Sequence, residues 1–72
     1  MAQFTTYARS RMAERGVSEV DVDSALAQEV RPPRPGNRPG RLIRSGLDTR
    51  GRMIEVVQNE HGEIVNVLIP RR

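Results

Sequence analysis

Apolar side chains recur at helical spacing in the first thirty residues, in two runs that one glycine separates. The first run places its apolar residues on one side of a helix: Phe4, Ala8 and Met12. Thr5 or Thr6 can cap the start of this helix, and Gly16 can adopt the left-handed conformation that commonly ends one. The spacing therefore predicts a helix over Tyr7–Arg15.

The second run begins with residues typical of a helix N-terminus. Ser18 is the expected cap, and Asp21 stands three residues later, where a capping box has its acid. Val17 and Val22 flank the cap as a hydrophobic staple does. The positions of the apolar stripe that follows are Val22, Ala25, Leu26 and Val30. We therefore expect a helical hairpin over residues 5–30.

Residues 31–40 break this pattern because four of the five prolines lie there. Proline removes a backbone donor and disfavours helix in the residue before it. This segment is predicted to cross from the helices to the rest of the chain as a loop or a polyproline-II stretch.

From residue 41 to residue 69, apolar and polar residues follow the period of strands. Three strands are predicted, separated by turns near residues 47–51 and 59–62: Arg41–Ser45, Arg52–Gln58 and Glu63–Ile69. The expected fold class is α+β, with the N-terminal helical hairpin packed on a three-stranded antiparallel β-sheet in one domain of residues 1–72. The last strand is apolar on both faces, which fits a central strand covered on both sides, or a strand with one face on the helices and the other on a partner. Since the chain is too short for a large core, a homodimer or another bound partner is expected.

Composition limits the chemistry of the chain. It has 72 residues, one histidine and no cysteine, so disulfides and thiolate metal sites are excluded and no metal ion or cofactor is expected. No apolar run reaches the roughly 18–20 residues that a membrane helix needs, and no signal-peptide layout begins the chain. The prediction is a small cytoplasmic protein that does not engage a membrane.

Positive charge is concentrated in the middle of the chain. The net charge is only +3, but residues 31–52 contain seven of the twelve arginines and one aspartate. Such a basic segment favours a polyanionic partner. Four of its arginines are the predicted nucleic-acid contacts: Arg38, Arg41, Arg44 and Arg52. The alternative is that the segment is a solvent-exposed loop without a polyanionic partner. Its arginines would then be ordinary surface cations of a chain that has no lysine.

Tyr7, Arg11 and Arg15 form a second candidate cluster. They stand four residues apart, so they project from successive turns on one side of the first helix. Guanidinium groups stabilise charge on phosphate oxygens and a phenol can exchange a proton, which together suit a phosphodiester substrate. The structural alternative is that these residues only stabilise the fold: the two arginines pair with Glu14 and Glu19, and the tyrosine packs on the sheet.

The segment from Tyr7 to Ser18 resembles the opening of a known family. It reads Tyr-Ala-Arg-Ser-Arg-Met-Ala-Glu-Arg-Gly-Val-Ser. The family's pattern is His-Ala-x-x-Arg-Met-x-Glu-Arg-Gly-Ile-Ser, found in small bacterial domains of unknown function that are similar to RelE/ParE/BrnT-like toxins. Residues 62–70 resemble that family's last strand. Arg11 and Arg15 match the pattern, whereas Tyr7 stands where the family has histidine.

The resemblance implies a RelE-like fold and a toxin-type RNA-binding domain. If the metal-independent endoribonuclease activity of such toxins is retained, Arg11 would clamp the scissile phosphate, Arg15 would support it and Tyr7 would transfer a proton. The resemblance also implies RNA, free or on the ribosome, and a small antitoxin or immunity protein as partners. The alternative, which the replaced histidine motivates, is a non-catalytic module that binds nucleic acid or protein on the same fold.

Overall fold

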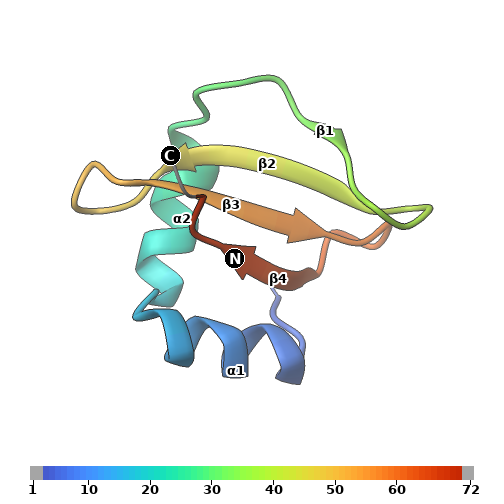
Figure 1. Ribbon diagram of the computed structural model, residues 1–72, viewed down its shortest axis with the longest axis horizontal. Coiled ribbons are helices and arrows are strands. Elements are labelled where there is room, and N and C mark those ends of the chain that lie inside the picture. Colours follow the sequence, from blue (N-terminus) through green and yellow to red (C-terminus); the bar gives the residue numbers. More distant parts are fainter. Residues whose placement is uncertain (1–2, 71–72) are drawn as a thin grey trace.

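The computed structural model describes residues 3–70 as two helices and a four-stranded antiparallel sheet (Figure 1). The helices are α1 (Thr6–Arg15) and α2 (Glu19–Ala27), and the strands are β1 (Arg34–Pro35), β2 (Leu42–Leu47), β3 (Met53–Gln58) and β4 (Ile64–Leu68). The strands lie side by side in chain order. The predicted α+β class and its two N-terminal helices are thus confirmed. Neither helix is long and apolar enough to span a bilayer.

Both helices start at the caps expected from the sequence. Thr5 Oγ1 accepts a hydrogen bond from the Ala8 N–H (3.1 Å), and Gly16 ends α1 with a φ of 66°. Ser18 and Asp21 form a reciprocal capping box at the start of α2. These local signals therefore place both ends of α1 and the start of α2.

One hydrophobic core joins both helices to one face of the sheet. Its buried members are Ala8, Met12, Val17, Val22, Ala25, Ile54, Val56, Ile64 and Val67. α2 approaches β2 very closely at Gly46, where a Cβ atom would lie 1.9 Å from the carbonyl oxygen of Ala25. Glycine is therefore required there, because the helix backbone occupies the space of a side chain.

The strand register defines a second face, directed away from the helices. Ile43 pairs with Val57, and Val57 pairs with Asn66. Directly paired residues in a sheet project to the same side, so these three side chains form a row across the strands. We call the surface around this row the open face.

A β-bulge in β4 places two consecutive side chains on the open face. Val57 pairs with Asn66. The next pair is Gln58 with Ile64, so Val65 is an extra residue opposite β3. Val65 and Asn66 consequently both lie on the open face, whereas Ile64 is buried in the core. The strand is therefore apolar on both faces: Ile64 and Val67 lie in the core, and Val65 and Leu68 lie on the open face.

The sheet contains a fourth strand that the sequence analysis did not predict. β1 lies within the segment predicted as a crossing, where Arg34 pairs with Ile43 and Pro35 pairs with Leu42. Proline is tolerated because β1 is at the edge of the sheet, where its missing N–H interrupts no ladder. The expected three-stranded sheet is therefore corrected to four strands.

Backbone contacts also flank the strands at both sides of the sheet. α2 ends at Ala27, before the predicted end at residue 30, because the backbone that follows bridges to β2 between Glu29 and Gly46. On the other side, Phe4 forms a parallel bridge with Ile64. This second bridge brings the start of α1 to the edge of β4.

Candidate nucleic-acid interface

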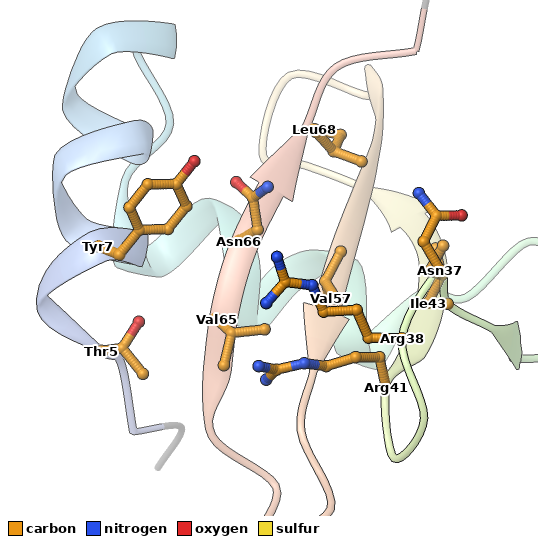
Figure 2. Close-up of a pocket in the computed structure, with 11 residues that line it drawn as sticks. Thr5, Tyr7, Asn37, Arg38, Arg41, Ile43, Val57, Val65, Asn66 and Leu68 are labelled. Carbon is orange, nitrogen blue, oxygen red and sulfur yellow. The ribbon is translucent and has the colours of Figure 1, made fainter.

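The open face carries a groove of about 680 Å³ between the β1–β2 connection and the start of α1 (Figure 2). Its floor is apolar and is formed by side chains of β2, β3 and β4: Ile43, Val57, Val65 and Leu68. Its polar lining comes from the start of α1, from the hairpin and from the bulge: Thr5, Tyr7, Asn37, Arg38, Arg41 and Asn66. The groove thus combines an apolar base with polar and charged walls.

A Pro-Gly turn holds two arginines together on one wall. The Arg41 N–H donates to the carbonyl oxygen of Arg38 (3.1 Å), so these two residues are the first and last positions of the turn. Pro39 takes the second position and Gly40 the third, with a φ of 78°, as in a type II β-turn. Figure 2 shows both arginine side chains extending from this hairpin toward β4.

Neither of these arginines is neutralised by a carboxylate within the described part of the chain. Among residues 3–70, Arg38 and Arg41 form no ion pair. Glu60 lies beside the turn, with its Oε2 3.4 Å from the position that a Cβ atom would take at Gly40, and it lines a second hollow of about 370 Å³ at the same hairpin. Its carboxylate lies 3.9 Å from His61 Nε2. The groove wall therefore keeps two positive charges available to an anion.

Tyr7 forms the opposite wall. The backbone before α1 is fixed to β4 by hydrogen bonds from the Thr5 N–H to the Ile64 carbonyl oxygen (3.0 Å) and from the Ile64 N–H to the Gln3 carbonyl oxygen (2.7 Å). α1 therefore starts beside β4, and Tyr7 reaches the groove with 59% of its surface exposed. The guanidinium carbon of Arg11 lies 5.9 Å from the centre of the Tyr7 ring, in cation–π contact.

Three of the seven predicted site residues line this groove: Tyr7, Arg38 and Arg41. The other two predicted nucleic-acid contacts are held by neighbouring side chains. Arg44 donates through Nε to Gln58 Oε1 (2.6 Å) and through Nη1 to Glu29 Oε1 (3.1 Å). Arg52 donates through Nε to Asp48 Oδ2 (2.9 Å). Arg44 and Arg52 therefore stabilise the fold in this structure and lie outside the groove lining.

The remaining two predicted residues, Arg11 and Arg15, are also absent from the groove lining. Arg11 Nη1 donates to Glu14 Oε1 (3.0 Å), one turn along α1, as the structural alternative expects. Arg15 forms no ion pair with residues 3–70, and its Nη1 is buried without a hydrogen-bond partner among them. Of the cluster on α1, only Tyr7 faces the groove, with Arg11 behind its ring.

Two residues of the open face were missed by the sequence analysis. Arg34 donates through Nη2 to Glu55 Oε2 (2.5 Å) and through Nη1 to Ser45 Oγ (3.3 Å), and so covers the sheet beside the groove. Asn66 lies in the bulge, and its Oδ1 accepts a hydrogen bond from the Val67 N–H (2.9 Å). Both positions depend on strand register, for which the sequence has no local signal.

The carboxylates with displaced pKa values are not part of the groove. A backbone hydrogen bond from Ser18, followed by one from the Thr49 hydroxyl, holds the pKa of Asp21 far below its usual range. At Asp48, burial alone would raise the pKa, but hydrogen bonds from Arg52 hold it below the usual value. The groove lining contains no carboxylate and no histidine. Residues 3–70 also hold no group of three side chains placed to ligate a metal ion.

The groove is therefore suited to bind a ligand that carries both negative charge and flat apolar groups. Two guanidinium groups face an aromatic ring across an apolar floor. Comparisons with protein-family models, curated proteins and solved structures find no match to this chain.

Proposed function

We propose that the open face of this protein binds single-stranded RNA. The observation that carries the proposal is the position of Arg38 and Arg41, without ion pairs among residues 3–70, opposite Tyr7 across an apolar floor. Guanidinium groups bind phosphate oxygens, an exposed aromatic ring stacks on bases, and an apolar floor accepts the faces of unpaired bases. Residues 7–18 resemble small bacterial domains of unknown function that are similar to RelE/ParE/BrnT-like toxins, and this resemblance is the reason to choose RNA over other polyanions.

A single strand suits this surface better than a duplex. The bases of a duplex are stacked inside it, whereas sequence-tolerant binding of single strands combines a basic wall with stacking platforms. The groove volume of about 680 Å³ is in the range of pockets for small ligands, so only a short part of the strand would lie in it. The flanking backbone would pass the hairpin on one side and Tyr7 on the other.

The groove is better suited to bind RNA than to cleave it. General acid–base catalysis at neutral pH usually relies on histidine or a carboxyl group, and the groove lining has neither. Arg11, the predicted clamp for a scissile phosphate, is paired with Glu14. The protein would therefore hold RNA, and an endoribonuclease role of Tyr7 is an outcome that the assay below can detect.

The test is a fluorescence anisotropy titration with labelled single-stranded RNA of about eight nucleotides, at salt concentrations between about 50 and 200 mM. Each phosphate contact contributes about 0.7 to the slope of log affinity against log salt for a single strand. The double variant Arg38→Ala/Arg41→Ala should therefore bind more weakly and lose about 1.4 of that slope. Arg50→Ala is the matched control, because Arg50 is exposed and lies outside the groove.

Two results would contradict the proposal. One is the absence of binding at the lowest salt by a protein that circular dichroism shows to be folded. The other is an equal loss of affinity in the double variant and in the Arg50 control. Gel analysis of the same samples should show intact RNA; cleavage products that disappear with Tyr7→Phe would instead establish the ribonuclease role implied by the family resemblance.

A further inference from the structure

We propose that Asn66 makes the groove selective for uracil and guanine, which carry a carbonyl group at position 4 of the pyrimidine or position 6 of the purine, over cytosine and adenine, which carry an amino group there. This inference rests on the proposed binding of single-stranded RNA. In the proposed function, some residues bind the RNA backbone and others stack on its bases. Asn66 would have a third role, the selection of the base.

The β-bulge determines which part of the Asn66 side chain is available. Its Oδ1 accepts the Val67 N–H (2.9 Å), a bond that only the amide oxygen can make. The Nδ2 group, with two donor hydrogens, has no hydrogen-bond acceptor among residues 3–70. Figure 2 shows Oδ1 on the α1 side of Asn66 and Nδ2 on the side of the hairpin. The side chain therefore presents donors to the groove.

The floor beside Nδ2 is suitable for one base. Val57 pairs directly with Asn66 across the sheet, and Leu68 lies two residues along β4 on the same face. A base lying on these two apolar side chains would bring one edge to the Asn66 amide. Arg38 and Arg41 reach over the same floor from the hairpin, where they can bind the adjoining phosphates.

The hydrogen-bonding code of the bases then gives the selectivity. Uracil O4 and guanine O6 accept hydrogen bonds, whereas cytosine N4 and adenine N6 donate them from the equivalent position. When this edge of the base faces Asn66, the Nδ2 donor, oriented by the bond from the Val67 N–H to Oδ1, pairs with the carbonyl, whereas it faces a second donor if the base carries an amine there. Because one hydrogen bond and not a bidentate pair is involved, we expect a preference of roughly fivefold.

Oligouridine and oligocytidine of about eight nucleotides are the sharpest pair of probes, since both are pyrimidines and differ at the O4 or N4 position. We expect the wild-type protein to bind oligouridine roughly fivefold more tightly in fluorescence anisotropy. Asn66→Asp keeps an oxygen for the Val67 N–H but presents only acceptors, so the ratio should fall below one. Its added negative charge weakens both complexes, and the ratio of the two affinities cancels that effect.

Asn66→Ala provides the second variant and should bind both probes about equally. A thermal melt of each variant shows whether the fold is retained. An independent measurement uses wild-type protein, in which oligouridine should shift the Asn66 side-chain amide resonances and oligocytidine should shift them less.

The outcomes separate this inference from the proposed function. Equal binding of both probes by the wild type overturns the role of Asn66 and leaves RNA binding standing. A uridine preference that survives in both Asn66 variants also overturns it, because the selectivity then arises elsewhere. Failure of the folded wild type to bind either probe overturns RNA binding itself.

Discussion

Replacing Asp21 by asparagine should remove a large part of the folding stability of this protein. Asp21 is only 3% exposed. It accepts hydrogen bonds from the Ser18 N–H (3.0 Å) and the Thr49 N–H (3.2 Å), and a further one from the Thr49 hydroxyl. The side chain thus connects the first turn of α2 to the turn between β2 and β3.

The magnitude follows from these contacts. A hydrogen bond to a charged group contributes about 1.5–3 kcal/mol, and a helix cap contributes about 1 kcal/mol. Asparagine keeps the volume and one acceptor oxygen but loses the charge, so we expect Asp21→Asn to cost about 2–3 kcal/mol. At about 0.05–0.15 kcal/mol per residue, that is a substantial fraction of the total for a chain of this size. The melting temperature should fall by about 10–20 °C.

The contribution of Asp21 to folding stability should decrease at low pH. The hydrogen bonds from Ser18 and Thr49 lower the pKa of Asp21 in the folded state. A carboxylate with a lowered folded pKa stabilises the protein above its unfolded pKa of about 3.9, and this contribution declines as the pH falls below that value. The stability difference between wild type and Asp21→Asn should therefore be full near pH 7 and shrink steadily below about pH 4.

Urea denaturation of wild type and variant at a series of pH values is the assay. Asp23→Asn is the control, because Asp23 is exposed on the same helix and makes no hydrogen bond or ion pair within residues 3–70. If Asp21→Asn and Asp23→Asn were equally stable near pH 7, or if the difference for Asp21→Asn were the same at about pH 3 as at pH 7, the reasoning would be refuted.

Two further changes test the packing of the sheet. Gly46→Ala would place its methyl group 1.9 Å from the Ala25 carbonyl oxygen, where backbone faces backbone, so urea unfolding should show a loss of about 3 kcal/mol or more. Arg34→Met leaves the Glu55 carboxylate, whose side chain is 11% exposed, without its ion pair. Because Arg34 itself is 44% exposed and screened by water, the expected loss is only about 1–2 kcal/mol, and adding Glu55→Gln should recover most of it in a double-mutant cycle.

The parts of the fold that the sequence predicts well are those set by neighbouring residues. Gly16 ends α1, and Ser18 with Asp21 forms the capping box of α2, because these signals act over three or four residues. The Pro-Gly pair between Arg38 and Arg41 is a signal of the same kind. A Pro-Gly turn at this point predicts that the two arginines lie together, whereas a loop that crosses from the helices to the sheet does not.

The remaining features depend on partners far away in the chain. Arg44 and Arg52 look equivalent to Arg38 and Arg41 in the sequence, but Arg44 meets Glu29 through the docking of the segment after α2 on β2. The bulge that exposes Asn66 arises from the register between β3 and β4. Register is determined by the whole core and not by any local run of residues, so the floor of the groove and the place of Asn66 in it could not be predicted from the sequence.

The proline-rich edge of the sheet also affects how molecules of this protein meet one another. A long edge strand with unpaired N–H and C=O groups invites another chain to add a strand, which leads to aggregation. β1 is two residues long and one of them, Pro35, has no N–H to offer. At the opposite edge, Phe4 bridges Ile64 and the Asn66 side chain accepts the Val67 N–H. Within residues 3–70 both edges are therefore poor templates for strand addition, and a second macromolecule should approach this sheet through its face.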